Sequence, residues 1–245
     1  MIGAVGGSGT RVFSRIARHA GVFMGNRRDD QEDARSLSPF YGEFTTDYLA
    51  AHGSPDAAWS ARAGTRLLEC LREHLQALPG PEHPWGVKNP RSLLMLPFWH
   101  ERFPELRFLH VIRDGRDMAY SQAQNQVRRH GRALLGSDME LPPPERAMLW
   151  WAQVNSSAAD YGESELGRGY LRVRLEDLCA RPKRTIRSLF EFMHADAGMR
   201  ASIREVETPP TLGRWRERPE AEVARLVALG GSALRRFGYA VEAVG

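Results

Sequence analysis

Short apolar runs that alternate with helical patterns constrain the fold of this chain more than any other feature. Residues 106–112 (LRFLHVI) form the clearest strand, and residues 2–5 and 170–175 are two further strand candidates. The segment 85–88 is a shorter fourth candidate. Strands separated by helices form right-handed βαβ units around a parallel sheet. The pattern therefore predicts an α/β fold, in which a single domain over residues 1–245 has a central parallel β-sheet flanked by helices.

Apolar residues at helical spacing predict the helices that separate these strands. Residues 26–36 are polar and predict a loop. Helices are expected at 12–17, 57–78, 91–101, 115–130, 144–154, 182–193 and 219–237. No internal repeat or low-complexity tract divides the sequence, which agrees with one domain.

The charge of the chain favours an anionic ligand over nucleic acid. The formal net charge is +4, and of the 34 lysine and arginine residues only Lys88 and Lys183 are lysines. No long basic run or basic–aromatic stripe of the kind that binds nucleic acid is present. The preference for arginine over lysine is typical of a GC-rich bacterial genome.

No segment of the sequence predicts a membrane span or a secretory leader. No stretch approaches about 18 uninterrupted apolar residues, and residues 1–6 lack a charged region followed by a long apolar run. Cys70 and Cys179 lie far apart, so neither a metal spacing nor a disulfide framework is expected. These features predict a cytoplasmic protein.

The first candidate phosphate site is the loop Gly6-Gly7-Ser8-Gly9-Thr10-Arg11, which follows the first strand and opens a helix. Such a loop aims backbone N–H groups at one point beside the positive end of a helix dipole. Ser8 and Thr10 add hydroxyl donors. An ordinary tight turn has a similar composition, and the loop fits neither the Walker A pattern nor G-x-G-x-x-G.

The second candidate phosphate site follows residues 106–112. Arg113 comes directly after this strand, where open α/β sheets bind their ligands. Ser121 is expected in the first turns of the next helix. An arginine fork and a hydroxyl together suit a phosphate, although Arg–Asp pairs in an ordinary surface loop would look similar.

Five segments, taken in order, resemble the family of sulfotransferases that use 3′-phosphoadenosine 5′-phosphosulfate (PAPS). The segments are 6–11, 86–90 (GVKNP), 108–121 (FLHVIRDGRDMAYS), 173–178 (VRLEDL) and 212–216 (LGRWR). The resemblance implies a P-loop NTPase-like sulfotransferase fold without a metal. It also implies transfer of a sulfuryl group from PAPS to a hydroxyl or amine of an acceptor.

The resemblance also implies roles for particular residues. Arg113 and Ser121 would hold the 3′-phosphate of the nucleotide, and Lys88 would be the catalytic cation. Trp215 would stack on adenine while Arg214 or Arg216 meets the 3′-phosphate. The 5′ end of the donor would be held by Gly7, Ser8, Gly9, Thr10 and Arg11.

One position departs from the family pattern. The family usually has a lysine or arginine just before Ser-Gly-Thr in the first loop, and here that residue is Gly7. The charge that would stabilise the departing bridge oxygen is therefore absent from this position. Arg11 or Lys88 is expected to supply it.

The catalytic base is expected among the acidic residues that follow the first predicted helix. In cytosolic members a histidine follows two residues after the motif lysine, but Pro90 stands there in this chain. By resemblance to members that use a glutamate, Glu32 is the first candidate and Asp33 the second. Glu43 and Asp47 remain open, and an acidic cluster of this kind can also be a solvated loop. His110 alternates along a core strand, so we expect it to be packed.

Two other functions remain open at this point. A small-molecule P-loop kinase would need a lysine in the first loop, which is absent. A nucleotide-binding module without catalysis would fit the missing cation at Gly7. For the sulfotransferase, a carbohydrate or small-metabolite acceptor is favoured.

Overall fold

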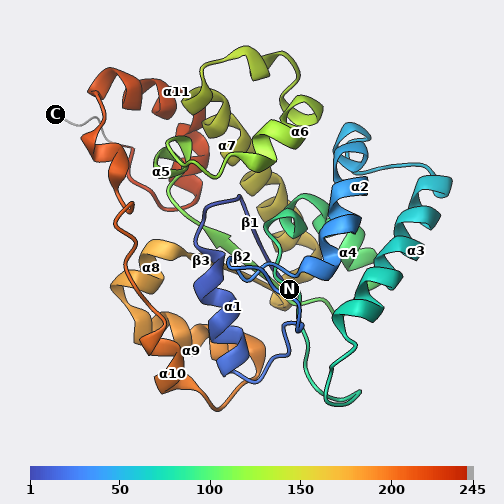
Figure 1. The fold of residues 1–245 in the computed structure, drawn as a ribbon. Coiled ribbons are helices and arrows are strands. Elements are labelled where there is room, and N and C mark those ends of the chain that lie inside the picture. Colours follow the sequence, from blue (N-terminus) through green and yellow to red (C-terminus); the bar gives the residue numbers. More distant parts are fainter. Residues whose placement is uncertain (242–245) are drawn as a thin grey trace.

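The computed structural model describes residues 1–241, so the last four residues of the expected 1–245 domain lie outside it. A parallel three-stranded sheet lies at the centre, in the order β1 (Ile2–Ala4), β2 (Phe108–Ile112) and β3 (Tyr170–Arg174) (Figure 1). The expected α/β class with a central parallel sheet is confirmed. β3 ends one residue earlier than predicted, because Leu175 begins the next helix.

The predicted strand at 85–88 extends the sheet by isolated contacts. Lys88 pairs in parallel with Ile2. The N–H of Ile2 donates to the carbonyl of Val87 over 2.8 Å, and the N–H of Asn89 donates to the carbonyl of Ile2 over 3.2 Å. Pro90 then ends the pairing, because it has no N–H to donate. Lys88 is thereby fixed on the side of β1 that faces away from β2.

Helices cover both faces of the sheet (Figure 1). One group, α1, α8, α9 and α10, lies on one side, and the others lie on the opposite side and around it. None of the helices within residues 1–241 is both long and apolar enough to cross a bilayer. The bounds are α1 Thr10–His19, α2 Ser38–Ala50, α3 Ala57–His74, α4 Leu96–Arg102, α5 Gly115–Ala119, α6 Asn125–Leu135, α7 Pro143–Tyr161, α8 Leu175–Ala180, α9 Pro182–Met193, α10 Met199–Arg204 and α11 Glu220–Arg236.

The alternation of β2 divides the core in two. Leu109 and Val111 join a cluster with residues of α1 and α9, whereas Phe108 and Ile112 join a larger cluster with α2, α3, α4 and α7. Side chains of successive strand residues point to opposite faces, so each face of a buried strand needs its own apolar cover. Four of the five residues of β2 are apolar and the fifth, His110, is also buried, so the strand shows no alternation between buried and exposed residues.

The predicted helix 115–130 is wrong as one element. The structure has α5 and α6 there, joined by a turn at 120–124. The Gln124 side chain donates to the carbonyls of Met118 (2.8 Å) and Ser121 (3.0 Å), and Ser121 Oγ accepts from the N–H of Ala123 over 3.2 Å. These side-chain hydrogen bonds replace the backbone hydrogen bonds that would continue the helix. Ser121 therefore lies in a turn after α5 and not within a helix.

His110 is packed, as expected. The side chain is fully buried, with Nδ1 2.6 Å from the hydroxyl of Tyr170 and Nε2 2.9 Å from Oδ1 of Asn155 on α7. Burial lowers the pKa of His110 to about 4. The neutral ring joins β2 to β3 and α7, and both ring nitrogens are occupied by these contacts.

Candidate active site

A cavity of about 670 Å³ lies at the carboxyl ends of the strands. Its walls come from the glycine loop, the segment 88–91, Arg113, Leu175, one face of α6 and the segment 204–210. Three anionic side chains line it, Asp33, Glu205 and Glu207, against seven cationic ones, Arg11, Arg15, Lys88, Arg91, Arg113, Arg129 and Arg204. A cavity with this excess concentrates anions.

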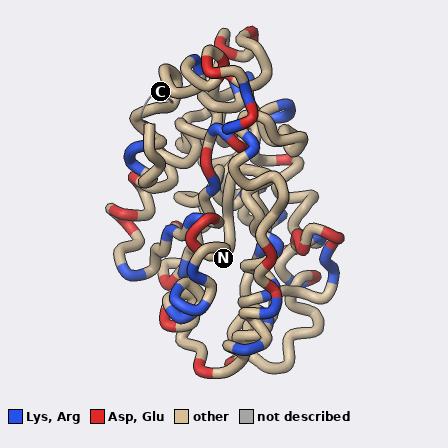
Figure 2. The backbone as a smooth tube through the Cα atoms, turned by 90° about the vertical axis from the view of Figure 1, so that its left-hand side faces the viewer, with Lys and Arg blue, Asp and Glu red and all other residues tan. Residues whose placement is uncertain are grey.

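The excess of cationic over anionic side chains belongs to the cavity and not to one face of the molecule. In Figure 2 basic and acidic residues are interspersed along the backbone, and neither sign takes over the visible side. No group of three or more His, Cys, Asp or Glu side chains that could hold a metal ion occurs within residues 1–241. The positive side chains that line the cavity are arginines and Lys88.

The glycine loop is organised by its own hydrogen bonds. Ser8 donates to the carbonyl of Val5 through its N–H (3.2 Å) and through its hydroxyl (2.7 Å), so the Ser8 side chain points inward. The N–H of Gly6 donates to Oε1 of Gln126 on α6 over 2.9 Å. Within residues 1–241, no hydrogen-bond acceptor from outside the helix is present for the N–H groups of Thr10 and Arg11. The first turn of α1 therefore offers free donors to an anion in the cavity.

Gly7 explains why the loop has no cation at this position. Its φ is +94°, in the left-handed region. A Cβ at this position would lie 2.9 Å from Oγ of Ser121 and 3.2 Å from Cβ of Ala123. The turn after α5 thus packs directly on the loop, and a lysine or arginine cannot occupy this position without moving that turn.

Replacing Gly7 with alanine is expected to lower the free energy of unfolding by about 1–3 kcal/mol, because an L-residue is strained at this φ. Gly6→Ala is the matched control. A Cβ on Gly6 would meet its nearest atom, the carbonyl oxygen of Ala123, at 3.4 Å, and its φ is not positive. Thermal melts of the two variants measure the difference. Equal melting temperatures for both would contradict this account of the loop.

Lys88 and Asp33 form a pair on the other side of the loop. Lys88 is 2% exposed, and its Nζ donates to the carbonyl of Gln31 over 2.7 Å and to the carboxylate of Asp33. Both residues line the cavity. Burial raises the pKa of Asp33, and the charge of Lys88 opposes this shift. A cation and a partly desolvated carboxylate therefore meet at one point of the cavity wall.

Glu32, the first candidate for the base, does not line this cavity. It borders a smaller hollow with Arg15 and Arg18, and Arg28 lies 3.1 Å from its carboxylate. The side chain of Asp29 accepts from the N–H groups of Gln31 and Asp33, each over 2.9 Å. In this turn Glu32 has a φ of +63°. The carboxylates of Glu32 and Asp33 therefore lie in different environments, although the two residues are adjacent in the sequence. Two further candidates, on α2, are exposed and do not line the cavity either: Glu43 and Asp47.

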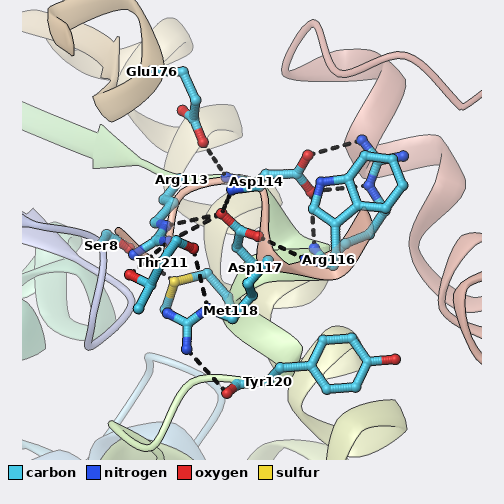
Figure 3. A network of polar contacts seen from close by, with 12 residues as sticks. Ser8, Arg113, Asp114, Arg116, Asp117, Met118, Tyr120, Glu176 and Thr211 are labelled. Atoms are coloured by element: carbon cyan, nitrogen blue, oxygen red, sulfur yellow. Dashed lines mark hydrogen bonds and ion pairs between the residues drawn. The ribbon is translucent and has the colours of Figure 1, made fainter. Parts of the chain in front are cut away.

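Arg113 lines the cavity from the end of β2 and is held by a buried carboxylate (Figure 3). Its Nη2 lies 3.0 Å from Oδ2 of Asp117, and it also donates to the carbonyl of Thr211. Asp117 is fully buried and accepts from the N–H groups of Gly213 (2.7 Å) and Trp215 (3.2 Å). Arg113 Nη1 has no hydrogen bond to residues 1–241. One carboxylate thus fixes both Arg113 and the segment 212–216, called the late loop below, and leaves one nitrogen of the Arg113 guanidinium available.

Asp117→Asn is expected to destabilise the protein by about 3–5 kcal/mol, because the buried guanidinium of Arg113 loses its counter-charge. In a chain of this size each kcal/mol lowers the melting temperature by about 2–4 °C. Asp160→Asn is the control. Asp160 is 69% exposed and pairs with Arg236 at the surface, so its loss costs at most about 1 kcal/mol. A melting temperature of the Asp117 variant no lower than that of the control would show that the network stabilises nothing.

The side chains of the late loop make contacts within the protein. Trp215 is 7% exposed, and the guanidinium of Arg116 lies 3.7 Å from the centre of its ring. Arg214 donates to the carbonyl of Tyr120 over 3.2 Å. Burial and the charge of Arg113 lower the pKa of Arg214. Arg216 is exposed. None of the three residues nominated here for the nucleotide lines the cavity, so their roles stay predictions.

The structure brings about half of the nominated residues together around one space. Those that line the cavity are Gly7, Gly9, Thr10, Arg11, Lys88 and Arg113, together with the second base candidate Asp33. Those that do not are Ser8, Glu32, Ser121, Arg214, Trp215 and Arg216. Sequence reasoning missed Asp117, whose position four residues after Arg113 was the available signal. It also missed the α6 residues Arg129 and His130, because α6 was merged with α5.

Comparison with known proteins identifies the family to which this protein belongs. The model of the sulfotransferase family matches residues 10–197, most of the chain, so this protein belongs to the sulfotransferase family. The chain is also similar to a sulfotransferase of known crystal structure from Alicyclobacillus acidocaldarius. The two share 16% sequence identity, the match covers 96% of this chain and 98% of the other, and the TM-score is 0.46. No curated protein sequence matches the chain.

Proposed function

We propose that this sulfotransferase uses PAPS as its donor and transfers the sulfuryl group to a hydroxyl or amine of a small metabolite or glycan, as a single domain. The observation that carries the proposal is the meeting of the first turn of α1, Arg113 and Lys88 around one cationic cavity. The residues fit an adenosine donor with phosphates at both ends. The loop offers N–H donors for one anionic group, and the free Nη1 of Arg113 offers charged N–H donors for a second.

The 5′ end of the donor would lie at the glycine loop. The N–H groups of Gly9, Thr10 and Arg11 and the dipole of α1 favour negative charge there. The 3′-phosphate would lie toward Arg113, which follows the neighbouring strand β2. Ser121 packs on Gly7 between these two points, so a small movement of the turn would bring its hydroxyl into reach.

Lys88 would stabilise the charge that develops on the oxygen bridging sulfur and phosphorus. The donor supplies the activated sulfuryl group, and the protein supplies positioned charge. Lys88 is held by the carbonyl of Gln31 and by Asp33, so little reorganisation is needed during the reaction. Arg11 is exposed in the first turn of α1 and lines the cavity, so it is a second cation for the same group.

Asp33 would accept the proton of the acceptor. Of the carboxylates nominated from the sequence, it is the one that lines the cavity. When the acceptor oxygen bonds to sulfur, the sulfur–oxygen bond to the phosphate breaks and the acceptor proton passes to Asp33. A base with a raised pKa receives this proton more readily than an ordinary aspartate.

The proposal is tested by incubating the protein with PAPS and a panel of sugar and phenolic acceptors. Chromatography then measures the 3′-phosphoadenosine 5′-phosphate (PAP) that is formed. Acceptor-dependent release of PAP supports it. A small-molecule kinase would instead release ADP from ATP with the same panel. PAP binding without transfer to any acceptor would favour the non-catalytic module.

A further inference from the structure

Two arginines at one end of the cavity have no carboxylate partner. Arg91, which follows Pro90, and Arg129 on α6 both line the cavity. Within residues 1–241 neither guanidinium lies within 4.0 Å of a carboxylate. By contrast, Arg15, Lys88 and Arg113 are each paired with one. The charges of Arg91 and Arg129 are therefore available to a ligand.

This end of the cavity lies across the glycine loop from Arg113. The segment 87–89 pairs with the edge of β1, whereas β2 and Arg113 lie on its other side. α6 crosses toward α2, where Nδ1 of His130 lies 2.8 Å from Oγ1 of Thr46. If the donor occupies the glycine loop and the Arg113 side, the acceptor is left with the end that holds Arg91 and Arg129.

Arg91 is held in place and partly desolvated. Its guanidinium lies 5.2 Å from the centre of the buried Tyr41 ring, and its Nε is 3.3 Å from Oδ1 of Asn89. Burial and the positive charge of Arg129 lower the pKa of Arg91. The carboxylate of Asp33 opposes this shift but is itself paired with Lys88, so an anion bound at Arg91 and Arg129 would further reduce the repulsion between the two guanidinium groups. The planar guanidinium forks suit a carboxylate, a sulfate or a phosphate ester.

His130 places an unpaired polar atom at the same end of the cavity. The residue is 3% exposed and lines the cavity, yet its Nε2 has no hydrogen-bond partner within residues 1–241. Burial and the charges of Arg91 and Arg129 lower the pKa of His130 to about 4. The neutral ring adds no charge of its own. Nε2 of His130 is one of ten buried side-chain atoms without a hydrogen-bond partner in the described residues, and it lies on the residue next to Arg129.

We propose that the acceptor carries an anionic group, a carboxylate or a sulfate or phosphate ester, that Arg91 and Arg129 bind beside the hydroxyl to be modified. This inference rests on the proposed function, because the donor fixes which end is left to the acceptor. The anionic group would lie at Arg91 and Arg129, and the reacting hydroxyl would lie at Asp33 and Lys88. The enzyme would thereby discriminate acidic acceptors from neutral ones of the same shape.

Calorimetry with matched probes in the presence of saturating PAP tests this inference. One pair is 4-hydroxyphenylacetate and its neutral amide, and the other is methyl glucuronide and methyl glucoside. In at least one pair the acid is expected to bind at least about 10-fold more tightly than the neutral compound. The two arms separate an aromatic acid from a sugar acid. Equal affinities within both pairs would overturn the inference.

Two variants locate the effect. Arg91→Gln and Arg129→Gln should each abolish the preference for the acid and leave the affinity for PAP unchanged. Arg128→Gln is the control, because this neighbour on α6 is exposed and does not line the cavity. An acid preference that survives in both cavity variants would contradict the assignment. Loss of PAP affinity in them would place these arginines at the donor instead.

The same titrations separate the two proposals. If PAP does not bind but the acids do so through Arg91 and Arg129, the donor assignment fails and the anion site stands. If PAP binds and neither acid is preferred, the anion site fails and the donor assignment stands.

Discussion

Replacing Asp33 with asparagine is expected to lower kcat/KM for sulfuryl transfer by about 10²- to 10⁴-fold, the usual contribution of a positioned base. Asparagine keeps the shape of the side chain but cannot accept the acceptor proton. Asp33 lines the cavity and contacts Lys88. The wild-type rate should also fall toward acidic pH, as Asp33 becomes protonated. Because burial raises the pKa of Asp33, this fall should begin at a higher pH than for a free aspartate, whose pKa is about 3.9.

Glu32→Gln is the matched control, since Glu32 is the neighbouring carboxylate and does not line the cavity. Its activity should stay within about threefold of wild type, and its acid limb should be retained. The acid limb should disappear from the residual activity of Asp33→Asn. If the Asp33 variant kept wild-type activity and the Glu32 variant were inactive, Glu32 would be the base instead.

Lys88→Met is expected to lower kcat by about 10²- to 10³-fold, the cost of removing one preorganised charge from a developing anion. Methionine fills the space of the buried stem without the charge. The affinity for PAP should also fall, because the oxygen that bridged sulfur and phosphorus stays on PAP as part of its charged 5′-phosphate. Rates under single-turnover conditions and calorimetry with PAP measure the two effects separately.

The chain supplies its own control for this variant. Lys183, the only other lysine, is exposed on α9 and does not line the cavity, so Lys183→Met should behave as wild type. Arg11→Ala decides whether a second cation contributes. An unchanged turnover in Arg11→Ala would remove that role from Arg11, and turnover of Lys88→Met near the wild-type value would remove the role from Lys88.

The strands and the order of the motifs could be predicted from local patterns. The mostly apolar segments 106–112 and 2–5 both contain strands of the parallel sheet, because burial on both faces favours apolar residues along a strand. The glycine loop could be predicted because consecutive glycines between an apolar run and a helical pattern are a local signal. Those signals lie within a few residues of one another in the sequence.

The parts that the sequence could not predict depend on contacts between distant residues or on the geometry of a turn. Glu32 and Asp33 are adjacent, and only the turn around Asp29 decides which of them meets Lys88. The helix expected at 115–130 breaks because side chains of the turn compete with the helical ladder. The late loop lies where Asp117 holds it, almost a hundred residues away in the chain. The spacing of residues in the sequence does not predict the contact between Asp117 and this loop.

A contact between residues far apart in the sequence also explains why position 7 carries no cationic side chain. The sequence left open whether the loop was defective or compensated. In the structure the turn at 120–124 occupies the space that a side chain on Gly7 would need, and the cations stand elsewhere around the cavity, at Arg11, Lys88, Arg91 and Arg129. The loop is therefore built for close packing, and the positive charge of the site comes from its other walls.

Calorimetric titration with PAP and with adenosine 5′-phosphate tests the central claim most directly, because the two nucleotides differ only in the 3′-phosphate. We predict that PAP binds at least about 100-fold more tightly, and that Arg113→Lys, which keeps a positive charge beside Asp117, reduces this preference by at least about 10-fold. Arg113→Ala is less suitable, because it would leave Asp117 buried without its counter-charge. Equal affinity for the two nucleotides would contradict the assignment of PAPS as the donor.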